Sequence, residues 1–151
     1  IIYRMRRDHF TVAAECLDPA DAESPTLSIA YDGPKETLTS QLSEDDDLIS
    51  ASDIDVAFRF QNDHESDSAS GVCSLTHRVT GEYLLECNAD GETVLDLVAA
   101  AREENDEARY QIKLDRRNGS PIVYDLDALL VYDAEGNLLR QHSLIPSGVE
   151  L

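Results

Sequence analysis

The most strongly patterned stretch of the sequence is Val72–Cys87, which reads VCSLTHRVTGEYLLEC. Two runs of alternating apolar and polar residues flank the segment Val79-Thr80-Gly81, and this arrangement predicts a β-hairpin. Glycine at the third loop position fits a three-residue turn, because the last residue of such a turn has a positive φ. On one face of the sheet, the resulting register pairs Cys73 with Cys87, Leu75 with Leu85, and His77 with Tyr83.

Two later segments carry the same turn chemistry. Arg117-Asn118-Gly119 and Ala134-Glu135-Gly136 also place glycine at the third loop position. Around the first of these turns, one register keeps the apolar residues on a single face. It pairs Leu114 with Ile122, Ile112 with Tyr124, and Tyr110 with Leu126.

The remaining periodicity completes an α+β domain. Alternation predicts strands over Phe10–Cys16, Thr26–Tyr31 and Ile54–Phe60, and helical spacing predicts helices over about Pro34–Leu42 and Gly91–Glu104. A length of 151 residues is typical of one domain. We expect a largely antiparallel sheet with two helices, one of them short, packed as a single layer of helix on sheet.

The charge composition is the most unusual feature of the chain. It has 31 acidic against 12 basic residues, a net charge of −19, and only Lys35 and Lys113 are lysines. This pattern is typical of haloarchaeal cytoplasmic proteins, because molar salt shortens the Debye length to about 3 Å and screens self-repulsion. The same charge disfavours nucleic-acid binding, and no apolar run approaches the roughly 18 residues of a membrane span. An acidic surface directed at a basic partner is the alternative interpretation.

The three cysteines, Cys16, Cys73 and Cys87, are irregularly spaced and odd in number, which fits a reduced cytoplasmic protein without a disulfide framework. We interpret Cys73 and Cys87 as buried core thiols. The alternative is a thiolate–imidazole metal or catalytic site formed by these two cysteines with His77. On a strand, however, His77 would lie about 13 Å from Cys73. The motifs of familiar enzyme classes are absent, so we predict no catalytic residue and no cofactor.

Two carboxylate pairs are weak candidates for cation binding. Asp53 with Asp55, and Asp125 with Asp127, each place two carboxylates on one face of an extended segment. Such pairs arise often by chance in so acidic a chain. We therefore predict no metal at either pair.

The C-terminal segment, Leu138–Leu151, differs from the rest of the chain because Glu150 is its single acidic residue. Its apolar residues should be covered, either by the domain itself or by another protein. We favour docking on the domain, with partner binding as the alternative. The candidate interaction residues of this segment are Leu144, Ile145, Pro146 and Val149.

Three stretches, Met5–Phe10, Ile54–Arg59 and Leu138–Val149, resemble a family of small haloarchaeal proteins of unknown function. The resemblance extends over nearly the whole chain from Met5, which we expect to be the native start. It implies a haloarchaeal lineage and a cytoplasmic setting, and it carries no catalytic motif.

These observations favour a non-enzymatic interaction or regulatory module of a halophilic archaeon. Its partner would be an unidentified protein or another copy of the chain, and neither nucleic acid nor membrane is expected. The alternative is a small enzyme or metal-binding protein that uses the Cys73, His77 and Cys87 site.

Overall fold

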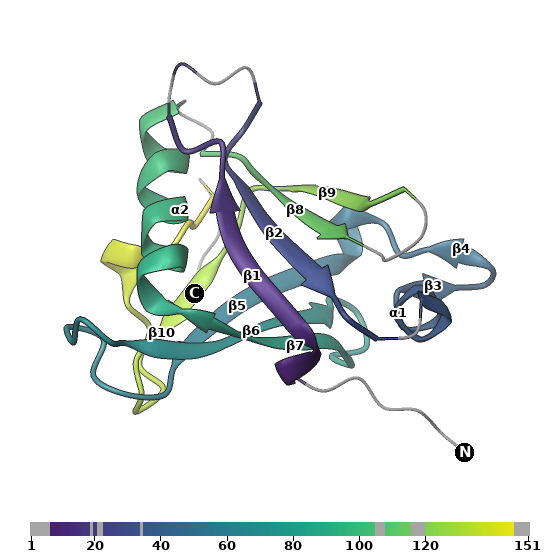
Figure 1. Cartoon of the computed structure of the whole chain (residues 1–151), viewed down its shortest axis with the longest axis horizontal. Coiled ribbons are helices and arrows are strands. Elements are labelled where there is room, and N and C mark those ends of the chain that lie inside the picture. Colours follow the sequence, from purple (N-terminus) through teal and green to yellow (C-terminus); the bar gives the residue numbers. More distant parts are fainter. Residues whose placement is uncertain are drawn as a thin grey trace.

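The computed structural model describes residues 7–18, 20, 23–33, 35–104, 108–115 and 120–146. Its helices and strands follow the predicted order, with short 3-10 helices (η) and one small hairpin added (Figure 1). In chain order they are η1 (Arg7–His9), β1 (Phe10–Glu15), β2 (Thr26–Tyr31), α1 (Lys35–Gln41), β3 (Ser43–Glu44), β4 (Asp47–Leu48), η2 (Ala51–Asp53), β5 (Ile54–Phe60), β6 (Ser70–His77), β7 (Tyr83–Asp90), α2 (Gly91–Glu104), β8 (Tyr110–Asp115), β9 (Ile122–Leu126), β10 (Leu130–Tyr132) and η3 (Arg140–His142).

The longer strands form two separate mixed sheets. Their strand orders are β1-β2-β8-β9 and β10-β5-β6-β7, while β3 and β4 pair only with each other. Strand β2 runs parallel to β8, and β10 runs parallel to β5. The α+β class and the two helices are confirmed, and most strand pairings are antiparallel as predicted. The prediction of a single sheet is wrong, because the strands divide into separate sheets that include parallel pairs. Each parallel pair joins strands far apart in the sequence, and local alternation does not specify such a partner.

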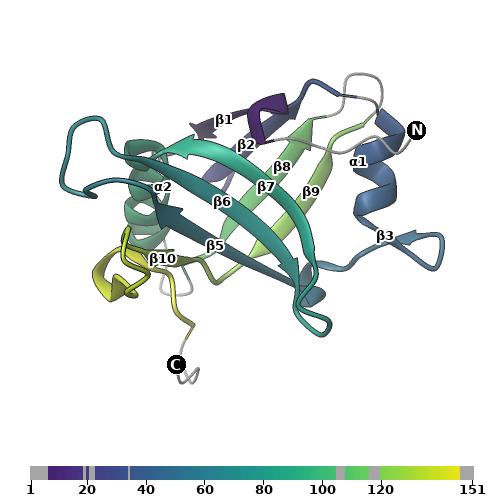
Figure 2. The same cartoon turned by 90° about the horizontal axis from the view of Figure 1, so that it is seen from below.

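The two sheets face each other and enclose the core (Figures 1 and 2). Leu27, Ile29 and Ile112 of one sheet and Phe58 and Leu75 of the other are fully buried. Strand β1 packs beside β7, and α2 contacts β1 and β2 of one sheet as well as β6 and β7 of the other. Helix α2 therefore covers one end of a two-sheet sandwich. The structure does not show the predicted single layer of helix on sheet.

Both helices bury the residues that their spacing predicted. In α2 the buried stripe consists of Val94, Leu97, Val98 and Ala101. Leu38 in α1 and Leu42 just after it are also fully buried. Among the described residues, no helix is long and apolar enough to cross a membrane.

Two of the three hairpins have the predicted geometry. Strands β8 and β9 pair in the predicted register, although the turn at 116–119 lies outside the described residues. At the turn after β10, the backbone N–H of Asp133 donates to the carbonyl oxygen of Asn137, and the N–H of Gly136 donates to the carbonyl oxygen of Asp133. These two hydrogen bonds close the three-residue loop. Gly136 is the third residue of this loop and has a φ of +87°, the positive value that a three-residue turn requires at that position.

The β6–β7 hairpin differs from the prediction at its closed end. Cys73 pairs with Cys87 as predicted, but the register then shifts by one residue, and Tyr83 lies opposite Thr76 instead of His77. The backbone N–H of His77 donates to the carbonyl of Glu82, so four residues form the loop instead of three. The extra residue on β7 forms a bulge, which the apolar pattern alone did not predict.

Candidate functional site

An open groove of about 520 Å³ lies over the outer face of the β5-β6-β7 sheet. Its floor is formed by Val72 and Ser74 of β6, which are half-buried. Arg59 of β5 lies opposite Val72, and Glu86 of β7 lies opposite Ser74. Short side chains in the centre and long ones at the sides create the groove. Figure 2, which views the molecule from this side, shows no described helix or strand across β6.

The β-bulge brings an aromatic side chain to this groove. Between the pairs Leu75–Leu85 and Thr76–Tyr83, the bulge places an extra residue, Leu84, in β7. Leu84 and Leu85 are both buried, whereas Tyr83 is 61% exposed and lines the groove. Bulges commonly redirect a side chain in this way. The predicted position of Tyr83 on the core face was therefore wrong.

Two arginines line the groove. Arg59 extends from the outer face of β5, and Arg7 comes from η1. The Arg59 Nη2 atom donates a hydrogen bond to the carbonyl oxygen of Ala134, at 3.1 Å. Within the described part of the chain, neither guanidinium forms an ion pair with a carboxylate. The groove therefore combines two cationic groups with an exposed aromatic ring in an otherwise acidic protein.

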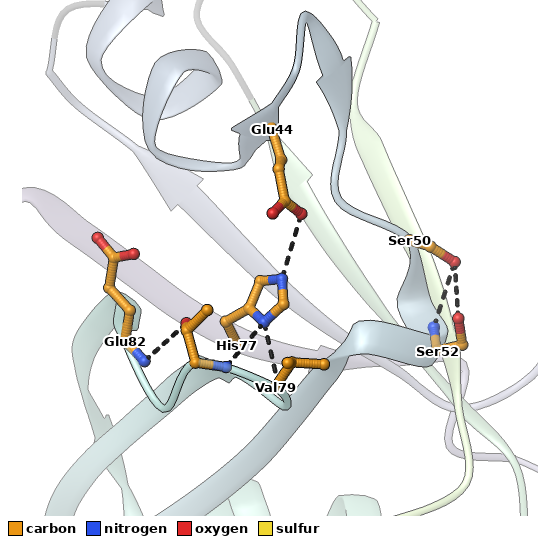
Figure 3. A network of polar contacts seen from close by, with 7 residues as sticks. Glu44, Ser50, Ser52, His77, Val79 and Glu82 are labelled. Carbon is orange, nitrogen blue, oxygen red and sulfur yellow. Dashed lines mark hydrogen bonds and ion pairs between the residues drawn. The ribbon is translucent and has the colours of Figure 1, made fainter.

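A second recess, of about 150 Å³, contains His77 and Glu44 (Figure 3). The His77 Nδ1 atom accepts hydrogen bonds from the backbone N–H groups of Val79 and Thr80, at 3.1 and 3.4 Å. Its Nε2 atom lies 3.2 Å from a carboxylate oxygen of Glu44. These contacts place the proton on Nε2, where it is donated to Glu44. The ring thus connects the β6–β7 turn to β3.

This arrangement leaves His77 poorly suited to chemistry. A general base or a metal ligand needs an accessible nitrogen lone pair, and the lone pair of Nδ1 is already used by two backbone donors. The ring itself is 7% exposed. We therefore interpret His77 as a structural residue that holds the hairpin turn and the β3–β4 hairpin together.

The two other members of the predicted Cys/His site lie deeper in the core. Cys73 and Cys87 are directly opposite each other and fully buried, and both are free thiols. The side-chain hydrogen bond between Cys73 and Cys87, and burial, raise the pKa of Cys73 well above its ordinary value, which opposes formation of the thiolate that a metal would need. His77 lies on the same strand four residues beyond Cys73, about 13 Å away at the usual strand rise. Among the described residues, no three His, Cys, Asp or Glu side chains are grouped to hold a metal ion.

One carboxylate of each candidate pair is engaged in another contact. Asp55 forms an ion pair with Arg78 at 2.9 Å, and Asp125 accepts a hydrogen bond from the side chain of Gln111 at 2.9 Å. These two carboxylates thus interact with neighbouring side chains at the surface. Nothing in this arrangement favours a cation.

The C-terminal segment docks on the domain as far as the structure describes it. Leu144 is 2% exposed and exchanges two backbone hydrogen bonds with Leu129, at 2.8 and 2.9 Å. Ile145 and Pro146 are half-buried, and Val149 lies outside the described residues. The hydroxyl of Ser143 accepts from the backbone N–H of Val131 and donates to a carbonyl of the same segment. Leu144 is therefore a core residue.

Arg102, in the last turn of α2, also holds this segment. Its guanidinium donates to the carbonyl oxygens of Arg140, Gln141 and Ser143 around η3. These carbonyl groups belong to the end of a short helix, where partners for backbone acceptors are scarce. A cation from another helix supplies the donors here. Sequence periodicity contained no signal for this contact.

Two histidines, His142 of η3 and His64 of the 61–69 loop, lie together. The rings of His64 and His142 are 6.4 Å apart, and Phe60 packs against His64 at 5.7 Å. Burial, the charge of His64 and the charge of Arg102, in that order, lower the pKa of His142. The pair joins the 61–69 loop to the C-terminal segment, two regions distant in the sequence.

Comparison with known proteins gives one match. A model of a family of unknown function (DUF5793) matches residues 5–151. Neither the search of curated proteins nor the search of solved structures finds a match. The match extends over nearly the entire sequence, and it confirms the resemblance to a single-domain family without an assigned role. This chain belongs to the family of unknown function DUF5793.

Proposed function

We propose that this chain is a non-enzymatic interaction module that binds a protein partner through the outer groove of β6. The observation that carries this proposal is the open groove of about 520 Å³ on a sheet face that no described helix or strand covers. Its half-buried floor and the exposed Tyr83 offer apolar and aromatic contacts, the kind of surface that forms the centre of protein interfaces.

The chemically reactive side chains support a binding role over catalysis. Cys73 and Cys87 are fully buried, and His77 uses both ring nitrogens in contacts with the protein itself. A small enzyme or metal-binding protein would need at least one of these groups accessible in a cleft. No observation in the described residues favours that alternative.

The setting that we propose is the salt-rich cytoplasm of a halophilic archaeon. The net charge of −19 and the scarcity of lysine support it, because such a charge destabilises a protein in dilute buffer and is tolerated in molar salt. The same charge argues against nucleic acid as the partner. The partner would be another protein, and a second copy of this chain is one outcome of the test.

The direct test is capture of partners from native haloarchaeal lysate at about 2 M KCl. Ser74→Tyr fills the floor of the groove with a residue that strands tolerate well. Val123→Tyr makes the same addition at a position that is 48% exposed on β9, in the other sheet. Both variants should keep the melting temperature of the unaltered protein.

We expect the unaltered protein and Val123→Tyr to retain the same protein, and Ser74→Tyr to lose it. Mass spectrometry of the retained protein distinguishes a foreign partner from a second copy of the chain. Equal capture by both variants would show that the partner binds elsewhere. Absence of any retained protein would contradict the proposed function.

A further inference from the structure

We infer that the groove selects a partner segment that carries carboxylate groups, held between Arg7 and Arg59. This inference rests on the proposed function and names the chemistry of the partner. The overall acidity of the chain alone would favour a basic partner, whereas the two arginines of the groove favour an acidic one.

Two arginines at one groove make it a local cationic site in a chain with 31 acidic residues and 12 basic ones. Within the described residues, Arg78 is the one arginine that forms an ion pair with a carboxylate, that of Asp55 at 2.9 Å. In the described residues, Arg7 and Arg59 form no such pair although both line one groove. Guanidinium groups bind carboxylates in a bidentate manner, which makes a carboxylate the complementary ligand.

Arg59 is already held in position before a ligand binds. Its Nη2 atom donates to the carbonyl oxygen of Ala134, in the turn that follows β10. A Cβ atom on Gly136 would lie 3.8 Å from the Arg59 guanidinium, so this turn lies directly against it. One hydrogen-bonding position is used, and the other guanidinium donors stay available to a ligand. A side chain fixed in this way loses less conformational entropy on binding.

The shape of the groove also fits a segment of a partner chain. The groove is open along the sheet and not enclosed, which suits a segment of a partner chain better than a small molecule. Tyr83 provides an aromatic surface for an apolar residue of that segment. Glu86 lies opposite Ser74 on the floor and repels carboxylates, so the acidic groups of the ligand belong near the two arginines and not at Glu86. A segment that alternates acidic and small residues meets these requirements.

The experiment uses two labelled synthetic peptides, one alternating glutamate and alanine and one alternating glutamine and alanine. Binding is measured by fluorescence anisotropy in the lowest KCl concentration at which circular dichroism reports folded protein, because molar salt weakens exposed ion pairs. The variants are Arg7→Gln with Arg59→Gln, and Arg140→Gln as a control. Arg140 is an exposed arginine of η3 and does not line the groove, so the control shows the effect of losing one positive charge elsewhere, whereas the double variant loses two at the groove.

We expect the glutamate peptide to bind more tightly than the glutamine peptide, and the double variant to weaken its binding about tenfold. Arg140→Gln should change binding less than twofold. Equal binding of the two peptides, or no effect of the double variant, would overturn the inference.

The two proposals fail in distinguishable ways. If Ser74→Tyr abolishes partner capture and the arginine double variant does not, the groove is the interaction surface but does not select acidic groups. If the double variant weakens peptide binding and no partner is captured from lysate, the groove recognises carboxylates but the role as a protein interaction module is wrong.

Discussion

Cys73 of β6 lies directly opposite Cys87 of β7 in the core between the two sheets, and both side chains are 0% exposed. Directly opposed residues of antiparallel strands have Cβ atoms about 4.5 to 5.5 Å apart, beyond the roughly 3.8 Å of a relaxed disulfide. The pair is therefore a packing contact between two thiols.

The first prediction concerns the reactivity of these thiols. A thiol reagent should react rapidly with the half-buried Cys16 alone in the native protein, and with all three cysteines after denaturation. Burial and the raised pKa of Cys73 suppress the thiolate that such reagents attack. Mass analysis of the native protein should find no disulfide. A stoichiometric bridge between Cys73 and Cys87 would refute this account of the core.

The second prediction concerns the C-terminal segment. Leu144→Ala should lower the free energy of unfolding by about 2 to 5 kcal/mol, because it removes a side chain that is 2% exposed. The exposed Gln141→Ala, three residues earlier, should change it by no more than about 0.5 kcal/mol. Denaturant unfolding in about 2 M KCl provides the measurement.

Truncation tests the same contact more severely. A chain ending at Ser143 loses Leu144 and its backbone pairing with Leu129, and it should be insoluble or much less stable. An unchanged melting temperature would mean that the segment does not stabilise the domain, and it would favour a role as a partner-binding tail.

The third prediction concerns pH. The folded-state pKa of His142 is lowered from 6.5, so the unfolded chain takes up this proton at a higher pH than the folded protein does. The contribution of His142 to stability is thus present above about pH 6.5 and is lost as pH falls towards the lower folded-state value. Relative to the unaltered protein, His142→Gln should lose less stability over this range. Parallel curves for the two proteins would contradict the sign of the shift.

The fourth prediction concerns salt. If the net charge of −19 reflects adaptation to molar salt, the melting temperature should rise steeply between about 0.1 and 2 M KCl as repulsion is screened. Sucrose provides a control, since it stabilises folded proteins without screening charge. A melting temperature that is flat in KCl would remove the halophilic interpretation.

Local sequence patterns predicted the elements whose signals are local. Alternation predicted a strand over Ile54–Phe60, and helical spacing predicted a helix over Gly91–Glu104. Strand β5 and helix α2 have these bounds in the structure. The β8–β9 register was also predictable, because a one-residue slip would have moved every apolar side chain to the wrong face.

The division into two sheets was not predictable from such patterns. An alternating strand buries one face equally well in either sheet, and the partner of β2 is β8, some eighty residues later. The bulge at Leu84 was not predicted because, in the run Tyr83-Leu84-Leu85, both Tyr83 and Leu84 are compatible with the core face. In the structure Leu84 is buried and Tyr83 is exposed. The groove depends on both features, so its residues were not recognised as a site. A signal in the sequence was Arg59, a basic residue on the polar face of β5 in a chain with 31 acidic and 12 basic residues.

Site-specific photocrosslinking in haloarchaeal lysate at about 2 M KCl tests most directly whether a partner binds at the outer groove of β6. A photoreactive amino acid replaces Tyr83 at the groove or, for comparison, Val123 on the other sheet, both of which are exposed. We expect one dominant crosslinked protein from position 83, lost when Ser74→Tyr is added, and no such product from position 123. Equal crosslinking from both positions, or a product from position 83 that survives Ser74→Tyr, would contradict the assignment of the groove as the interaction surface.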